Sequence, residues 1–439
     1  MSLAALSSSD PVQTAAYLRT LPAIRERCAR VHALAQAGKL NYFEYHPERE
    51  ADAVAFCVEV IKGGYGTDFA SIPPHGRCRT LDAGRPRLEP LVAHWKAGPN
   101  PPDTKEICRR LVDLCLVSVL LDAGAGNVWT YREKETGACF SRTEGLGVAS
   151  FEMFEQGFFS SNPANAYQAD ADALAKITTE RVAAAMQVSD ANPLVGLEGR
   201  ASLLVNLGTA LKSKPEFFGA SARPGNIVDF LEGQLVDGRA HVFALWTALI
   251  DGLQAIWPPT RAVLGGVALG DVWPCEALRK HPSPGPAEGD ELVPFHKLTG
   301  WMTYSLVEPI QKTMGWTFDG VEHLTGLPEY RNGGLLVDTG VLALRPGAIE
   351  ARFFPDPSTG IPKLPPSHPA IVEWRAMTVV ELDRLADLLR KEFGLGREQL
   401  SLAQVLESAT WTGGRAIAKE RRPATGGPPI EIESDGTVF

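Results

Sequence analysis

The sequence has no long hydrophobic run, no excess of positive charge and no paired cysteine spacing. Its two most apolar stretches, 111–125 and 242–257, are interrupted by Asp113, Asp122, Asp251 and Gln254. A membrane span of about 20 apolar residues is therefore not expected. The opening MSLAALSSSDP lacks the features of a signal peptide, and the odd number of cysteines (7) favours reduced thiols. These absences predict a cytoplasmic protein without membrane contact.

Basic residues are fewer than acidic residues. There are 43 Lys and Arg against 52 Asp and Glu, which gives a net charge of −9. A protein that binds the phosphate backbone of a nucleic acid needs a basic face, so no nucleic-acid partner is expected. A small basic pocket for one phosphate is still compatible with this charge.

The motifs of several common catalytic classes are missing. There is no P-loop, no H-E-x-x-H, no paired C-x-x-C and no G-x-S-x-G. Gly145-x-Gly147 lacks the third glycine of a dinucleotide-binding turn, and the nine histidines show no ligand spacing. The sequence therefore predicts neither a metal nor a cofactor, and it leaves the oligomeric state open.

Helical periodicity is what the sequence does contain. The segment 103–123 is apolar on nearly all sides, which is typical of a buried helix. The pattern predicts a mainly α, multi-helix globular fold with little or short β structure. We expect a helical N-terminal part over 1–100 and a helical core over 101–439, which could form one continuous domain. Helices are predicted at 22–37, 47–62, 88–96, 103–123, 144–158, 178–187, 196–212, 225–236, 241–257, 295–314, 369–393 and 401–420, and short strands near 128–131 and 430–432.

Three stretches between residues 122 and 226 could carry chemistry. Asp122 lies at the end of the predicted buried helix, where the helix dipole disfavours a carboxylate unless it has a cation, a hydrogen-bonded partner or a function. Arg142 and Glu144 flank a helix start that a ligand could approach. Arg223, Gly225 and Asn226 open another helix and could bind a phosphate. For each stretch an ordinary capping or ion-pair role is the open alternative.

The segment 316–338 is the most informative. It combines acids, an arginine, a histidine and aromatic residues beside a Gly-Gly break. The carboxylates of Glu329 and Asp338 could steady an oxocarbenium-like centre or activate water. Arg331 could orient a carboxylate or hold an anion, while Tyr330 and Trp316 offer flat surfaces to a planar ligand. The alternative is a polar turn between helices, held by ion pairs.

Several stretches resemble the uracil catabolism protein 4 family of bacteria and fungi, a family without an assigned reaction. They are Ser-Arg-Thr-Glu-Gly at 141–145, Leu-Pro-Glu-Tyr-Arg-Asn-Gly-Gly at 327–334, Thr-Trp-Thr-Gly-Gly-Arg at 410–415 and Gly-Gly-Pro-Pro at 426–429. The resemblance implies a role in a pathway where uracil becomes a nucleotide, its ring is opened and a ribosylurea-type intermediate yields urea.

The chain also resembles, more distantly, the queuosine 5′-phosphate N-glycosylase (queuosine salvage) family, which is all-helical and similar to DNA glycosylases. The matching pieces, 116–129, 144–158, 203–211, 225–226 and 230–231, occur in the same order. Glu329-Tyr330-Arg331 is similar to that family's Asp-Tyr-Arg motif, which implies a catalytic role for Glu329. The chain departs from that family in its longer acid and in the Asn-Gly-Gly that follows.

These resemblances imply a hydrolase of the N-glycosidase type. It would cleave a ribosylurea-type nucleoside or its 5′-phosphate, a small-molecule substrate, without a cofactor. Glu329 would stabilise the sugar cation or activate water, with Asp338 or Asp122 as a second acid. The remaining predicted site residues are Arg331, Tyr330, Trp316, Arg142, Glu144 and Phe158 for the substrate, and Arg223, Gly225 and Asn226 for the phosphate. The alternatives are an amidohydrolase acting on the urea or acyl portion, and a non-catalytic binding protein for a pathway intermediate.

Overall fold

The computed structural model describes residues 10–258 and 260–433. These residues form two compact units, each assembled from separate stretches of chain. Unit 1 comprises residues 10–74, 260–297 and 322–433, and unit 2 comprises residues 75–258 and 298–321. The boundary predicted near residue 100 falls inside unit 2. Residues 1–9 of the opening stretch lie outside the described residues.

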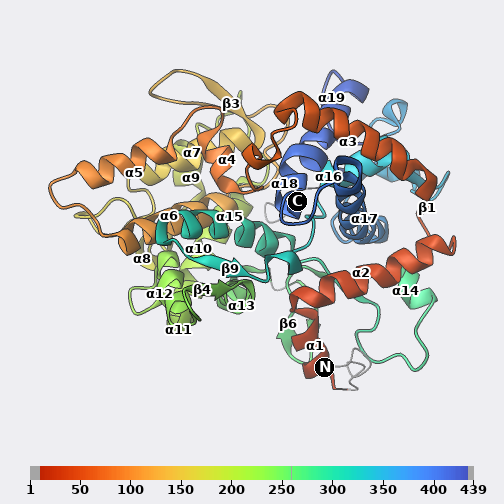
Figure 1. The fold of residues 1–439 in the computed structure, drawn as a ribbon, viewed down its shortest axis with the longest axis horizontal. Helices are drawn as coiled ribbons and strands as arrows, with labels where there is room; N and C mark the ends of the chain where they lie inside the picture. Colours follow the sequence, from red (N-terminus) through yellow and green to blue (C-terminus); the bar gives the residue numbers. More distant parts are fainter. Residues whose placement is uncertain (1–9, 259, 434–439) are drawn as a thin grey trace. The chain divides into compact units, whose positions relative to one another are not determined.

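The prediction of a mainly helical fold is confirmed (Figure 1). The helices of unit 1 are α1 (Pro11–Leu18), α2 (Leu21–Gln36), α3 (Glu50–Tyr65), α14 (Glu276–Lys280), α16 (Tyr330–Asp338), α17 (Pro369–Phe393), α18 (Leu402–Val405), a π-helical turn (Leu406–Thr410) and α19 (Trp411–Arg421). Those of unit 2 are α4 (Arg77–Asp82), α5 (Leu88–Ala97), α6 (Thr104–Leu120), α7 (Arg142–Glu155), α8 (Ala171–Leu174), α9 (Thr179–Ala185), α10 (Leu197–Ser213), α11 (Pro215–Phe218), α12 (Ile227–Glu232) and α13 (Val242–Gly252). Helix α15 (Lys297–Met314) begins at the last residue of a unit 1 stretch and continues in unit 2.

The β structure of the described residues consists of two-stranded pairs. In unit 1 the pairs are β1 (Phe43–Tyr45) with β10 (Leu342–Leu344), β5 (Val263–Leu264) with β6 (Val267–Ala268), β7 (Val272–Pro274) with β8 (Leu292–Pro294), and β11 (Lys363–Leu364) with β12 (Glu431–Ile432). In unit 2 they are β2 (Thr130–Arg132) with β3 (Cys139–Ser141) and β4 (Arg239–His241) with β9 (Thr317–Asp319). The two predicted short strands correspond to β2 and β12.

Local sequence signals explain where several helices begin and end. The hydroxyl of Thr20 caps α2, and a proline occupies the first turn. Helix α17 ends at Gly394, whose φ of +67° is the left-handed conformation of a helix C-terminus. The predicted buried helix is α6, whose residues from Leu111 to Leu120 are all buried.

Helix α16 lies between α17 and α19 in unit 1 (Figure 1). A Cβ atom added at Gly414 of α19 would stand 2.2 Å from the backbone oxygen of Arg331. One added at Gly333 would stand 2.7 Å from the Trp374 ring of α17. The glycines therefore allow the helices to approach closely. The predicted Gly-Gly break is wrong, because this packing holds Gly333 and Gly334 in a continuous helix.

Two further findings concern the whole described chain. Among the described residues, none of the helices combines the length and the apolar character needed to cross a bilayer. All seven cysteines are free thiols, and Cys139 is the exposed one.

A Gly414→Ala substitution tests the close approach of α16 and α19. The added methyl group would overlap the backbone of Arg331, so we expect unit 1 to lose about 1–3 kcal/mol of stability despite the better helix propensity of alanine. The measurement is the midpoint of thermal unfolding. Gly64→Ala in α3 is the matched control, since nothing lies within 4 Å of its added Cβ. Equal midpoints for the two variants would refute the tight contact.

Candidate functional site

Glu329 forms the N-terminal cap of α16. Its carboxylate accepts hydrogen bonds from the backbone N–H of Arg331 at 2.8 Å and of Asn332 at 2.6 Å. Burial raises the pKa of Glu329 above its ordinary value, while the two N–H groups and the charges of Lys297 and Arg331 lower it in part. A fixed orientation and a raised pKa are two properties expected of a carboxylate that acts as a general base.

Arg331 and Tyr330 flank this carboxylate in sequence. The Arg331 guanidinium donates a hydrogen bond to the carbonyl oxygen of Gly426 at 2.8 Å and lies over the Tyr330 ring, 4.9 Å from its centre. Arg331 therefore connects two of the stretches that carried the family resemblance. Its guanidinium is buried, so it serves to hold the ring and the 426–427 turn in place.

Asp338 lies at the other end of α16. Both of its carboxylate oxygens accept from Arg422, which also donates to the carbonyl oxygen of Gly427 at 2.6 Å. The nine residues of α16 rise about 1.5 Å each along the helix axis. The backbone of Asp338 therefore lies roughly 13 Å along the helix from the backbone of Glu329. Carboxylate pairs that cleave glycosidic bonds are about 5–9.5 Å apart. The geometry thus gives Asp338 a structural partner and does not bring it to Glu329.

A buried ion pair supports the start of α16. Arg375 of α17 binds both oxygens of Asp271 at 2.8 Å each and donates from Nε to the carbonyl oxygen of Pro328 at 3.2 Å. Asp271 also accepts from the Trp273 indole at 2.7 Å and from the Lys297 backbone N–H at 2.9 Å. These donors hold the pKa of Asp271 well below its ordinary range despite its burial.

Asp122 belongs to unit 2, just beyond the C-terminus of α6. It pairs at 2.8 Å with the fully buried Arg77 and accepts a hydrogen bond from the Thr143 hydroxyl. Arg77 also donates to the Ser118 hydroxyl at 2.7 Å. The cation that a carboxylate needs at this end of a helix is therefore present. A catalytic role for Asp122 stays a prediction.

Arg142 and Glu144 lie in the first turn of α7, next to Thr143. Arg142 has a φ of +54°, a left-handed conformation that is strained for a residue other than glycine. Such strain is concentrated at functional sites. The structure thus brings Asp122, Arg142 and Glu144 into one neighbourhood, and their predicted contact with a ligand is untested.

The turn predicted to bind phosphate already holds a carboxylate of the chain. Arg223 donates to Asp113 at 2.7 Å and pairs with Glu106 at 3.0 Å, and the Gly225 N–H donates to Asp113 at 2.6 Å. The Asn226 amide donates to the Phe218 carbonyl oxygen at 2.6 Å. The groups predicted to bind a phosphate, Arg223 and the Gly225 N–H, therefore bind the carboxylate of Asp113 in the structure.

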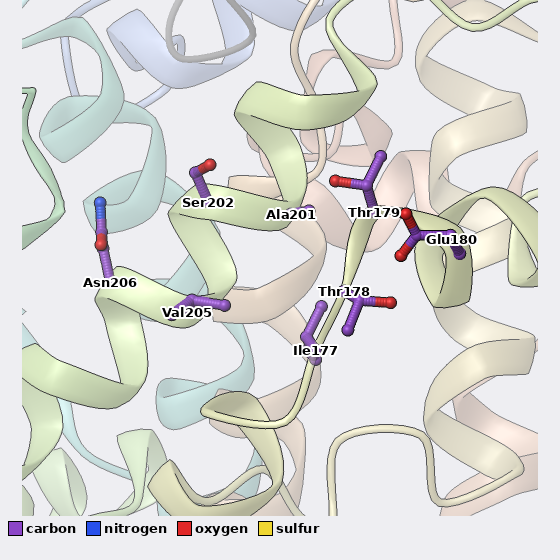
Figure 2. A pocket seen from close by; sticks show the side chains of 8 residues that line it. All are labelled: Ile177, Thr178, Thr179, Glu180, Ala201, Ser202, Val205 and Asn206. Atoms are coloured by element: carbon purple, nitrogen blue, oxygen red, sulfur yellow. The ribbon is translucent and has the colours of Figure 1, made fainter.

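The two remaining predicted aromatic residues also lie in unit 2. Trp316 is half-buried just before β9, and Phe158 packs edge-on against Phe159 with ring centres 5.1 Å apart. A cavity of about 380 Å³ lies between α9 and α10, and it includes none of the predicted residues (Figure 2). It is lined by Ile177, Thr178, Thr179, Glu180, Ala201, Ser202, Val205 and Asn206.

Sequence reasoning missed the residues that support Glu329. Asp271, Lys297 and Arg375 are distant in the chain, and none belongs to a motif. The one sequence signal is that the charged Asp271 lies among apolar residues of a strand region. A charge in that setting implies a buried partner, but the sequence does not show which residue that partner is. Across the described residues, no three His, Cys, Asp or Glu side chains are grouped so that they could hold a metal ion.

An Arg375→Met substitution tests the buried pair. It would leave Asp271 buried without its cation, so we expect a loss of about 3–5 kcal/mol in unfolding free energy. The measurement is chemical denaturation followed by circular dichroism. Arg397→Met is the control, because its partner Asp387 is 53% exposed and such pairs contribute about 1 kcal/mol or less. Similar losses in both variants would contradict the role given to Asp271 and Arg375.

Comparison with known proteins confirms the resemblance to uracil catabolism protein 4, while the more distant resemblance to the queuosine salvage family stays a prediction. The chain is 41% identical over 437 residues to "Uracil catabolism protein 4" of Lachancea kluyveri, covering 96% of this chain and 98% of that protein. It is 42% identical over 434 residues to "Protein urg3" of Schizosaccharomyces pombe, covering 97% of this chain and 99% of that protein. A family model described as a protein of unknown function, DUF1688, matches residues 17–439. The chain therefore belongs to the DUF1688 family, together with uracil catabolism protein 4.

Proposed function

We propose that this chain acts in uracil catabolism and hydrolyses the C1′–N bond of a ribosylurea or its 5′-phosphate. The name of the Lachancea kluyveri relative, uracil catabolism protein 4, supports the pathway. The observation that supports the reaction is the Glu329 carboxylate, which is oriented by two backbone N–H groups and has a pKa raised by burial. This is the side-chain chemistry that assists glycosidic cleavage.

The reaction requires water to replace the nitrogen on C1′. As the C1′–N bond breaks, positive charge develops on the sugar, and an ionised Glu329 stabilises that charge. The same carboxylate takes a proton from the attacking water, and the departing nitrogen gains a proton to give urea. The products are urea and ribose, or ribose 5-phosphate. The Tyr330 ring, held by Arg331, supplies a flat wall beside the reacting group.

The proposal depends on Glu329 and gives no part to Asp338, which is paired with Arg422. A role for Asp122 as a second acid stays a prediction, and the proposal does not depend on it. Arg223 and Gly225 already hold Asp113, so the proposal does not use them for a phosphate.

Replacement of Glu329 by glutamine should abolish most of the activity. The amide keeps the length of the side chain but cannot take a proton, so we expect urea release from ribosylurea to slow by about 10²–10⁴-fold. Urea is measured after incubation of the purified protein with ribosylurea and, separately, its 5′-phosphate. Glu398→Gln, at an exposed position, is the control. Wild-type rates in Glu329→Gln would remove this residue from the mechanism.

The pH profile gives a second test. Glu329 must be ionised to act as a base, so activity should fall as the pH drops through its raised pKa. We therefore expect the acid limb of kcat/KM to have its midpoint above about 4.3, the ordinary value for glutamate. A profile that stays flat down to pH 4 would show that no base of this kind is used.

A further inference from the structure

The Asn332 side chain lies in the first turn of α16 and is fully buried. Its backbone N–H donates to the Glu329 carboxylate at 2.6 Å, and its Nδ2 donates to the carbonyl oxygen of Leu327 at 2.9 Å. Because Leu327 precedes the helix, the Asn332 amide points toward the N-terminal end of α16, which carries Glu329. The Asn332 Oδ1 atom has no hydrogen-bond partner among the described residues. This end of the helix therefore contains a buried acceptor that is left open.

A second open polar group belongs to Thr410, the last residue of the π-helical turn that packs on α16. Gly414 of α19 lies against the backbone of Arg331 in the first turn of α16. Arg422, just beyond α19, pairs with Asp338 at the end of α16, so the two helices run in the same direction. Thr410 precedes Gly414 by one turn, or about 6 Å of rise, and so it lies toward the N-terminal end of α16.

The Thr410 hydroxyl is fully buried and finds no hydrogen-bond partner within residues 10–258 and 260–433. An unpaired polar group in the interior costs free energy, because it has lost its hydrogen bonds to water. A ligand that supplies the missing partner explains such a group, and π-helical turns are frequent at functional sites. The open acceptor of Asn332 and the open hydroxyl of Thr410 together suit a group that carries both an N–H and a carbonyl oxygen.

We infer that this end of α16 binds the urea portion of the substrate, with Asn332 Oδ1 accepting from a urea N–H and the Thr410 hydroxyl donating to the urea carbonyl oxygen. The inference rests on the proposed function and adds to it the groups that recognise the leaving portion. As the C1′–N bond breaks, its electron pair passes to the urea nitrogen and is shared with the carbonyl oxygen. A hydrogen bond from Thr410 to that oxygen stabilises the departing group before its nitrogen takes up a proton.

Binding of urea itself tests the site, measured by NMR on the full chain labelled with ¹⁵N-asparagine. The Asn332 signals are assigned as those absent from Asn332→Asp, which keeps the shape of the side chain. Urea should shift these signals until they saturate. Tetramethylurea has no N–H to donate, so it should bind about tenfold more weakly or worse. Asn332 signals that urea does not move, or equal binding of the two ureas, would overturn the inference.

A Thr410→Val substitution gives a second test that does not depend on Asn332. Valine has nearly the same shape but no hydroxyl, so we expect the affinity for urea to fall about tenfold. The midpoint of thermal unfolding should stay the same or rise, because the free protein loses no hydrogen bond. Thr339→Val is the matched control, since its hydroxyl donates to the Leu335 carbonyl oxygen at 2.7 Å. Its loss should lower the midpoint and leave the affinity for urea unchanged.

The outcomes separate this inference from the proposed function. If urea binds at Asn332 but the protein releases no urea from ribosylurea or its 5′-phosphate, the site stands and the proposed reaction is wrong. If Thr410→Val releases urea with the wild-type kcat/KM and binds urea with the wild-type affinity, the reaction stands and the inference about its leaving portion is overturned.

Discussion

The buried pair of Asp271 and Arg375 is the interaction on which the candidate site depends. Both side chains are almost completely buried, at 1% and 2% exposure. A charge pair in this environment is tolerated only when its other hydrogen-bonding groups are satisfied, and here Trp273, Lys297 and Pro328 take part. The pair joins a strand region, the start of α15, α17 and the residue before Glu329. It is better suited to fixing positions than to adding stability.

Close helix packing completes the support of Glu329. Gly333 and Gly414 allow α16 to lie against α17 and α19, and the Trp374 indole donates to the Gly333 carbonyl oxygen at 2.9 Å. Three of the four stretches that resembled the uracil catabolism family, 327–334, 410–415 and 426–429, therefore lie together in unit 1 for a physical reason. A carboxylate carried by tightly packed helices keeps nearly the same position despite thermal motion. Electrostatic catalysis requires charged groups that are held in position in this way.

The sequence was most informative about helices with strong local signals, such as α2, α6 and α17. It failed where distant contacts decide the structure. Gly333 and Gly334 indicate a break when read locally, yet neighbouring helices hold them in α16. Arg223 and Gly225 have the pattern of a phosphate site, but that pattern cannot show that Asp113 fills it. Glu329 could be singled out from a motif, whereas Asp271 and Arg375 are 104 residues apart and no local pattern connects them.

In the proposed reaction the bond between sugar and nitrogen is the one that breaks. The product balance, measured after the purified protein has consumed a known amount of ribosylurea, tests this step. We expect urea and free ribose in equal amounts, with no ammonia. Ammonia, or a product in which ribose remains attached to nitrogen, would contradict it and would identify an amidohydrolase instead.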